Sequence, residues 1–521
     1  MQIGKPVILV LILLLSFFSG CMFPAQTKFS LISLAVDDDA GFSRLHIRFN
    51  NSNDVTLTLQ DPTNKVVSSH FYYYGIHNES IYLSGYRTNS SPGTYTILVK
   101  DSQKNLIYNH ELSFNGSDLS ILQVTTDWWE EKPFFSLVGL LLKVKNDGDL
   151  PAYPYNIHVQ SPTTSSEALV VPTVVLPLQT TMVQCFVYIP NFSKEETTLN
   201  VSVLGKSGEL LAKTSRSVTP SASIPSWEYQ WYYLGSHTLK IPAIEWLYTY
   251  YNSLSRFDTS DYAAYVFDPF DDPYLSLVSA KLLLLSPKTT SETERIDFIA
   301  SFVQGIEYAK DDPLNDSYEY PKFPLETLKE QRGDCEDKAI LTAALLSCLG
   351  TNVTLLRLPH HMAVGIHLPQ PLSGYPFYID QYYFLETTVL HMPIGEIPPE
   401  YQGLSNITMY SITSRPLLFH FWKNATRFQM SNGTDYVYVK MMIENIGTQA
   451  ASDVEICGAF FDSMNGSYNL KTTHVAFLPQ NEKQIIELTF DVPPVSNTTL
   501  KTQLVFEGFV VHQRESVMRF S

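Results

Sequence analysis

One cysteine stands in a turn at the predicted start of an apolar helix. The segment from Gln331 to Gly350 has the sequence QRGDCEDKAILTAALLSCLG. Its stretch from Ala339 to Leu349 is almost wholly apolar and predicts a buried helix, which ends at Gly350, the residue type favoured just past a helix end. Cys335 would lie at the helix N-terminus, where unpaired N–H groups and the helix dipole favour a thiolate. Such a thiolate is a potential nucleophile.

A base and an acid follow in two strand-like segments. In the run Leu355–Leu368, His361 shares one strand face with small residues, which leaves room for a substrate. The run Tyr382–Thr388 contains a single carboxylate, Glu386. A nucleophile, a histidine and an acid from three different elements form the nucleophile–base–orienter arrangement of covalent catalysis.

In this order the motifs resemble the transglutaminase-like superfamily, and most closely the transglutaminase-like proteins of archaeal envelopes. The resemblance covers roughly Ser221 to Ser414. It implies a papain-like site with Cys335, His361 and Glu386 as the matching catalytic positions. Most of the superfamily has Asp at the third position, and the longer Glu386 keeps the charge but changes the reach. The matching segments are Arg295–Ile299, Glu319–Glu326, Gly333–Lys338, His361–Gly365 and Leu385–Thr388.

Alternatives to these assignments remain within the same segments. His360 is the second candidate for the base if the strand register shifts by one residue, and Asp380 is the second candidate for the orienter. Four histidines could suggest a metal cluster, but their spacing matches no metal-binding helix motif, so we expect no metal and no other cofactor. These histidines are His360, His361, His367 and His391.

The expected chemistry is acyl transfer on an amide or isopeptide bond. The Cys335 thiolate would attack the carbonyl, and the thioester would pass to water or to an amine. The Cys335 N–H would donate to the oxyanion, with Tyr320 or Gln331 as a second donor. The acids on either side of the cysteine should act as helix caps and oppose thiolate formation slightly; they are Asp334, Glu336 and Asp337.

The composition is that of a globular protein rather than a disordered one. The 521 residues are 44% hydrophobic and 17% charged, and the formal net charge is −17. The chain has no basic run with interleaved aromatics, so nucleic acid is not an expected partner. The acidic surface suits a protein outside the cell and weakly suggests a cationic partner. The expected partners are a protein or peptide substrate and components of the cell envelope.

The first 21 residues predict export and anchoring. Lys5 precedes a short apolar core, Val7–Phe18, and Ser19-Gly20-Cys21 resembles a lipoprotein processing site. An ordinary signal peptide or an uncleaved anchor are the alternatives. All three place the rest of the chain outside the cytoplasm, and the expected location is the cell surface, with the N-terminus anchored in the membrane. No later run approaches 18 consecutive apolar residues.

The other cysteines and the sequons fit an exported chain. Cys185, Cys348 and Cys457 are scattered and are expected to be core residues rather than zinc ligands. Frequent Asn-X-Ser/Thr sequons suggest a surface glycoprotein. They are Asn50, Asn78, Asn89, Asn115, Asn191, Asn200, Asn315, Asn352, Asn406, Asn424, Asn432, Asn465 and Asn497.

Strand-like segments surround the region with the candidate site. Leu142–Gly148 and Met441–Gly447 share an Asn-X-Gly pattern, each followed later by a Leu-Pro pair, which indicates an internal repeat whose glycine supplies a positive φ. We therefore expect a multidomain fold: an α+β, papain-like transglutaminase-like domain flanked by immunoglobulin-like β-sandwich domains. The predicted parts are an anchor at 1–21, β-sandwiches at 28–120, 121–220 and 415–521, and the α+β domain at 221–414.

The sequence leaves two classes of function open. One is a surface-anchored cysteine enzyme, either a hydrolase or an acyl transferase. The other is a non-catalytic surface scaffold or binding protein in which the middle domain only binds.

Overall fold

The computed structural model describes residues 28–257, 259–287, 291–311, 320–412, 415–429 and 433–520. The predicted signal and lipoprotein site at 1–21, and the motif residue Glu319, lie outside these ranges. Strand makes up 51% of the structure and helix 13%, in many small sheets. The expected fold class, an α+β papain-like domain between immunoglobulin-like sandwiches, is therefore wrong: the chain is mostly β. Apolar runs predicted helices well, but short alternating segments form strands even between the helices.

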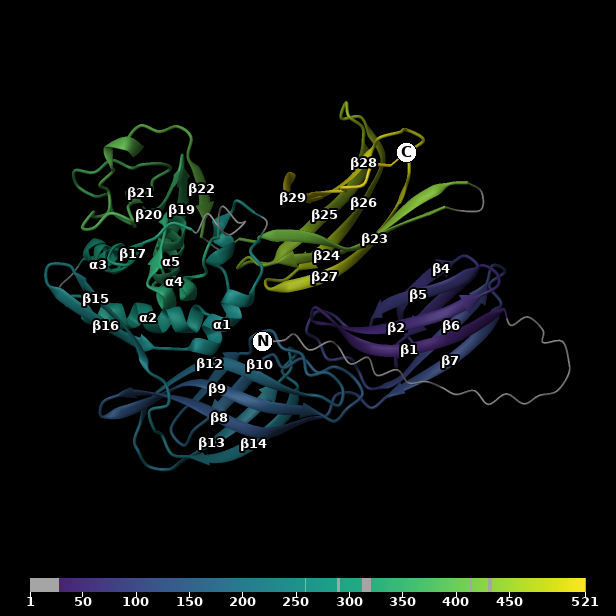
Figure 1. Ribbon diagram of the computed structural model, residues 1–521, viewed down its shortest axis with the longest axis horizontal. Helices are drawn as coiled ribbons and strands as arrows, with labels where there is room; N and C mark the ends of the chain where they lie inside the picture. Colours follow the sequence, from purple (N-terminus) through teal and green to yellow (C-terminus); the bar gives the residue numbers. More distant parts are fainter. Residues whose placement is uncertain are drawn as a thin grey trace. The chain divides into compact units, whose positions relative to one another are not determined.

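The chain forms two compact units, 1–223 and 224–521. The first is built of antiparallel sheets (Figure 1). Three strands pair in the order β1-β2-β5 and four in the order β4-β3-β6-β7; they are β1 (Phe29–Asp39), β2 (Phe42–Asn51), β3 (Val55–Gln60), β4 (Val66–Tyr72), β5 (Gly75–Tyr82), β6 (Gly93–Asp101) and β7 (Leu106–Phe114). In β3, buried and half-buried residues alternate, which is the pattern of a strand with one face in the core.

The same unit contains two further sheets, ordered β12-β9-β8 and β11-β10-β13-β14. Cys185 is fully buried in their apolar core, as expected. The strands are β8 (Leu119–Glu131), β9 (Phe134–Asn146), β10 (Asn156–Gln160), β11 (Ser165–Leu169), β12 (Thr180–Phe192), β13 (Thr197–Leu204) and β14 (Leu210–Val218).

The second unit begins with an antiparallel hairpin and then carries the α-helices, coloured teal to green in Figure 1. Helix α5 packs against β19 and β20, and α2, α3 and α4 pack against α5. The elements are β15 (Ser226–Tyr232), β16 (Ser236–Pro242), α1 (Glu245–Ser253), α2 (Asp272–Leu285), α3 (Glu292–Gln304), α4 (Pro324–Glu330) and α5 (Cys335–Ser347).

A four-stranded antiparallel sheet, ordered β21-β20-β19-β22, lies beside α5. Its strands are β19 (Asn352–Leu358), β20 (His361–His367), β21 (Tyr383–Leu385) and β22 (Thr408–Ser411). The two-residue strands β17 (Glu307–Tyr308) and β18 (Arg332–Gly333) pair in parallel just before α5. Because every residue of β20 except its two ends is buried, both faces of this strand are covered.

The last part of the chain is again made of antiparallel sheets, ordered β23-β24-β27 and β26-β25-β28-β29. The strands are β23 (Leu418–Gln429), β24 (Asp435–Asn445), β25 (Ala451–Phe461), β26 (Ser467–Leu478), β27 (Glu482–Asp491), β28 (Thr499–Phe506) and β29 (Phe509–Glu515). Cys457 is half-buried in β25.

The asparagines of the two matching Asn-X-Gly segments make the same pattern of hydrogen bonds. Asn146 accepts from the N–H of Gly148 at 3.0 Å and donates to the carbonyls of Leu150 and Val175. Asn445 likewise accepts from Gly447 at 3.1 Å, and it donates to the carbonyls of Gln449 and Leu478. Both asparagines are fully buried. Each asparagine therefore links the end of its strand to two other backbone segments.

The predicted positive φ at the repeat glycines is wrong, since neither is among the positive-φ glycines. Space is the reason for glycine instead. A Cβ at Gly148 would lie 2.1 Å from the Gly116 carbonyl oxygen, and one at Gly447 would lie 2.3 Å from that of Arg415. Another backbone segment passes too close for any side chain.

Candidate active site

Cys335 is the first residue of α5, so the helix begins four residues before the predicted stretch Ala339–Leu349, and the cysteine lies at its N-terminus as expected. The chain reaches it through the short pair β17–β18 and the N-cap residue Asp334. Asp337, one turn into the helix, accepts from the N–H of Lys322 at 2.8 Å and pairs with its ammonium at 2.9 Å. This buried ion pair holds the loop before α4 against the start of α5.

The three acids around the cysteine were expected to be helix caps and dipole partners, and they differ in what they do. The side chain of Asp334 makes no capping hydrogen bond. Glu336 instead accepts a hydrogen bond from the Cys335 thiol, with 3.2 Å between Sγ and Oε2. The expected capping is therefore wrong for Asp334, while Glu336 and Asp337 lie in the first turn of the helix as expected. Glu336 also opposes the thiolate, as the sequence predicted.

Burial and negative charge act together on the cysteine. Burial raises the pKa of the Cys335 thiol, and the neighbouring Glu336 carboxylate raises it further; the N–H of Met362 opposes this to a smaller extent. The helix N-terminus was expected to favour the thiolate. In the structure, burial and Glu336 both act against the thiolate, which opposes that expectation.

His361 is the first residue of β20, directly after the two-residue turn Pro359-His360. Its Nε2 lies 3.0 Å from Oε2 of Glu386, which follows β21. The imidazole stacks on Tyr401, with 4.7 Å between ring centroids and an angle of 1°. The predicted base and orienter therefore lie together, and Tyr401 fixes the plane of the ring.

The Glu386 carboxylate is fully buried and fully hydrogen-bonded. One oxygen binds His361, while the other accepts from the N–H groups of Thr387 and Thr388 and from the Thr388 hydroxyl, at 2.7–3.0 Å. Burial alone would raise the pKa of Glu386, but His361 and Thr388 hold it below its usual range. The acid is an anion in this buried site.

Cys335 lies beside β20, the strand that begins with His361. The Met362 N–H that reaches the sulfur belongs to β20, next to His361. The thiol donates to Glu336 rather than to the imidazole. Nδ1 of His361 makes no hydrogen bond to any residue in the described ranges.

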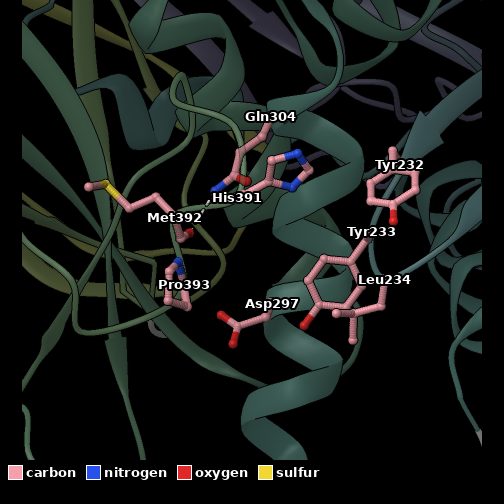
Figure 2. Close-up of a pocket in the computed structure, with 8 residues that line it drawn as sticks. All are labelled: Tyr232, Tyr233, Leu234, Asp297, Gln304, His391, Met392 and Pro393. Atoms are coloured by element: carbon pink, nitrogen blue, oxygen red, sulfur yellow. Dashed lines mark hydrogen bonds between the residues drawn. The ribbon is translucent and has the colours of Figure 1, made fainter.

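Two buried residues that the sequence did not single out support Glu386. Gln304, the last residue of α3, donates from its side-chain amide to the carbonyls of Glu386 and Met392, both at 2.9 Å. Figure 2 shows Gln304 beside Met392. Lys338 of α5 in turn donates to the carbonyls of Gln304 and Ile306, at 3.2 and 2.8 Å. Burial lowers the pKa of Lys338 to about 8. The signal in the sequence that could have found this contact was Lys338 itself, a lysine one helical turn after Cys335 that leads into a helix predicted to be buried.

The second candidates for base and orienter lie elsewhere. His360 is exposed in the turn, with φ 59°. Asp380 is exposed in another turn, with φ 44°. His367 packs on Tyr382, and His391 packs edge-on against Tyr232.

Tyr320 and Gln331, the suggested second oxyanion donors, use their polar groups in other contacts. The Tyr320 hydroxyl donates to Glu326 at 3.2 Å, and the Arg256 guanidinium lies over its ring. The Gln331 amide donates to the carbonyl of Glu228 in β15.

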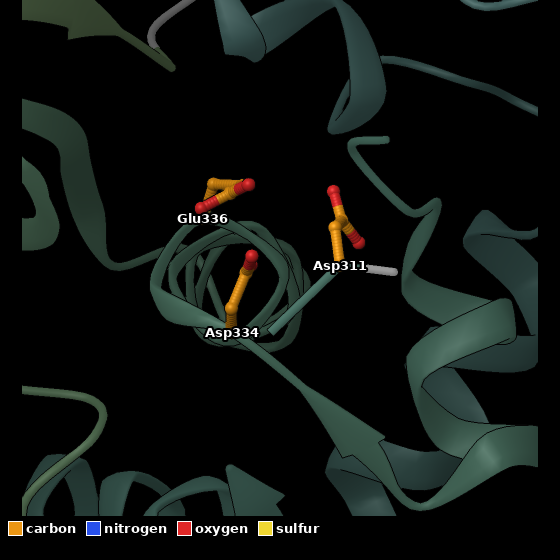
Figure 3. A group of neighbouring side chains, drawn as sticks. All are labelled: Asp311, Asp334 and Glu336. Carbon is orange, nitrogen blue, oxygen red and sulfur yellow. The ribbon is translucent and has the colours of Figure 1, made fainter. Parts of the chain in front are cut away.

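Three carboxylates gather near the start of α5. Asp311, Asp334 and Glu336 each offer one oxygen, and these oxygens lie within 4.8 Å of one another (Figure 3). Such a set of hard oxygen ligands is the kind that Ca²⁺ or Mg²⁺ prefers. None of the four histidines belongs to this group, the one set of potential metal ligands found in the described ranges.

Comparison with known proteins gives low similarities. No family model matches the chain, and no curated protein matches it. Similar solved structures include the exo-chitosanase CsxA of Amycolatopsis orientalis, at 7% identity and a TM-score of 0.16, over 91% of this chain and 76% of that one. Red sea bream transglutaminase has 10% identity and a TM-score of 0.16, over 73% and 79% of the two chains.

A further match is the BSP domain of a biofilm-associated protein, at 10% identity and a TM-score of 0.13, over 96% of this chain and 98% of that one. TM-scores this low carry no argument about fold or function. Within the described ranges, no helix is long and apolar enough to cross a membrane.

Proposed function

We propose that the chain is a cysteine enzyme that transfers acyl groups from amide or isopeptide bonds of a protein or peptide at the cell surface. The observation that carries the proposal is the His361–Glu386 hydrogen bond of 3.0 Å, next to a cysteine at a helix N-terminus. The arrangement brings together Cys335, His361 and Glu386 from three different segments of the chain. It leaves one imidazole nitrogen for the sulfur.

In the proposed first step, Nδ1 of His361 takes the proton of the Cys335 thiol. The sulfur attacks the carbonyl carbon, and the Cys335 N–H stabilises the oxyanion. The C–N bond then breaks, and His361 gives its proton to the leaving amine. Glu386 holds the imidazole orientation and stabilises the imidazolium. Water or an amine then cleaves the thioester, which gives either hydrolysis or transfer.

A second candidate is a non-catalytic surface protein that uses this region to bind. One observation favours this candidate. The Cys335 thiol donates a hydrogen bond to the Glu336 carboxylate, and burial together with this negative charge raises the pKa of the thiol. In this case the His361–Glu386 pair would be a structural link between β20 and the segment after β21. The location outside the cytoplasm belongs to both candidates and rests on the N-terminal sequence.

The deciding experiment is alkylation of Cys335 by iodoacetamide between pH 5 and 10. Labelled peptides are identified by mass spectrometry in the wild type and in His361→Ala. Reaction near neutral pH that His361→Ala slows about tenfold or more supports the enzyme. A rate that rises only at high pH and ignores His361 supports the binding protein. Cys348 is the internal control, because burial raises its pKa to about 12 and it should stay unlabelled at neutral pH.

A further inference from the structure

A pocket of about 310 Å³ is lined in part by Gln304, whose side-chain amide donates to the Glu386 carbonyl. The turn of the β15–β16 hairpin forms one side, α3 forms another, and the loop after β21 completes it (Figure 2). Its volume is at the lower end of the range for ligand pockets and suits one side chain rather than a large cofactor. The lining residues are Tyr232, Tyr233, Leu234, Asp297, Gln304, His391, Met392 and Pro393.

Helix α3 presents two hydrogen-bond acceptors to this pocket, two turns apart on one face. Asp297 accepts from the N–H of Ile394 with Oδ1 at 2.8 Å, and within the described ranges nothing donates to Oδ2. The side-chain amide hydrogens of Gln304 are donated to the carbonyls of Glu386 and Met392. The side-chain oxygen of the same amide therefore remains as an acceptor. The Gln304 residue is only 4% exposed, so this oxygen is held in place.

The rest of the lining suits a positive charge. Asp297 contributes a carboxylate, and the lining includes neither Lys nor Arg. Tyr232 and Tyr233 supply aromatic rings, whose faces attract cations. Leu234, Met392 and Pro393 are apolar and suit an aliphatic stem.

From this combination we infer that the pocket binds the basic side chain of a polypeptide partner: an ammonium or guanidinium at Asp297 and Gln304, with its stem against the apolar wall. The rim favours a polypeptide over a free amine, because Tyr232 and Leu234 are 61% and 84% exposed beside the opening, and Leu390 is 58% exposed next to His391. The net charge of −17 suits a basic partner.

This site is separate from the sulfur chemistry and goes beyond the proposed function. It needs no proton transfer at Cys335, so binding should survive Cys335→Ser. Gln304 joins the pocket to the carbonyls of Glu386 and Met392. A bound partner would therefore rest against the segment that carries the acid of the candidate site.

The test uses the full chain carrying Cys335→Ser and labelled peptides GGKGG, GGRGG and Gly-Gly-norleucine-Gly-Gly, with fluorescence anisotropy as the readout. At least one of the two basic peptides should bind, and the neutral peptide should bind at least about tenfold more weakly. Asp297→Asn keeps an acceptor for Ile394 and should weaken the basic peptide at least about tenfold. Tyr232→Ala should weaken it about threefold.

The matched control is Glu292→Gln, which removes an exposed charge from the same helix and should change nothing. Burial raises the pKa of Asp297 to about 6, so affinity should fall from pH 7 to pH 5 more in the Asp297 protein than in Asp297→Asn. The other ionisable groups near this carboxyl are Glu294, Tyr233 and His391, and both proteins retain them.

Two results would overturn the inference. The first is equal binding of the norleucine peptide, or binding that Asp297→Asn leaves unchanged, which would make the pocket merely apolar. The second is binding of free n-butylamine as tight as that of the best basic peptide, which would remove the argument for a polypeptide. Circular dichroism of each variant at 222 nm separates lost binding from lost folding.

Discussion

Glu386 shows what one extra methylene allows at the acid position. Because the side chain is long, one oxygen turns back to the N–H groups of Thr387 and Thr388 while the other reaches His361. The sequence left the reach of this glutamate open, and the structure gives both oxygens partners. A carboxylate that is buried and fully bonded has a fixed position from which to orient an imidazole.

Glu386→Gln should lower the neutral-pH alkylation rate of Cys335, and any acyl-transfer activity, by about a hundredfold, because a neutral amide cannot stabilise the imidazolium. Asp380→Asn is the matched control, since that carboxylate is exposed in a turn away from His361. The two variants are compared by mass spectrometry over the same range of pH. Equal rates in Glu386→Gln and the wild type would refute the orienting role.

Glu336 has the opposite effect on the thiol. Since its carboxylate accepts from Cys335 and raises the pKa of that group, Glu336→Gln should bring this pKa down. Alkylation at pH 7 should become severalfold faster, because a lower pKa raises the thiolate fraction. The rate is measured against Glu396→Gln, an exposed acid, which should match the wild type. A slower reaction in Glu336→Gln would mean that the glutamate assists the cysteine.

At the scale of elements, α3, α5 and the segment after β21 are joined by one buried polar chain. The Lys338 ammonium donates to the main-chain carbonyls of Gln304 and Ile306 at the end of α3. The Gln304 side-chain amide donates to the carbonyls of Glu386 and Met392, which follow β21. The helix that begins with Cys335 is thereby linked to the segment that carries Glu386.

Lys338→Met should destabilise the helical part of the chain by about 3 kcal/mol, because it leaves two buried carbonyl groups without their donor. The loss is measured from the urea midpoint of the 222 nm signal, which these helices dominate. Arg295→Met on the exposed face of α3 should stay within about 0.5 kcal/mol of the wild type. Similar midpoints for Lys338→Met and the wild type would show that water satisfies those carbonyls instead.

At the scale of the whole molecule, buried carboxyl groups before α2 set a pH dependence. Asp268 accepts from the Tyr251 hydroxyl at 2.7 Å, and Asp271 is 1% exposed. Burial raises the pKa of Asp268 to about 6, and burial with the charge of Asp268 raises that of Asp271. In the folded chain these groups keep protons that the unfolded chain has already lost. Their contribution to stability is therefore lost as pH rises from about 4 through the folded values.

Asp271→Asn removes this cost of ionisation and makes no change to capping, since the Asp271 side chain does not cap α2. The variant should have a higher Tm than the wild type at pH 8, and the difference should shrink at pH 5. Thermal melts at 222 nm across this range check the sign. A difference that is constant with pH would mean that Asp271 acts through packing and not through charge.

The amino-acid sequence by itself determined the local features of this protein. It predicted a buried helix directly after the Cys335 turn and strands around His361 and at Glu386, because apolar spacing and turn residues act over a few neighbours. It also predicted the paired Asn-X-Gly segments, although the reason for the glycines was wrong.

Only the tertiary structure decided the features that depend on distant segments. The balance of strand over helix overturned the expected fold class, since short strands are specified by their partners more than by their own sequence. The raised pKa of Cys335 follows from burial beside a strand that begins 26 residues later in the numbering, at His361. The Lys338–Gln304–Glu386 chain and the pocket at Asp297 likewise exist because folding brings α3, α5 and the loop after β21 together.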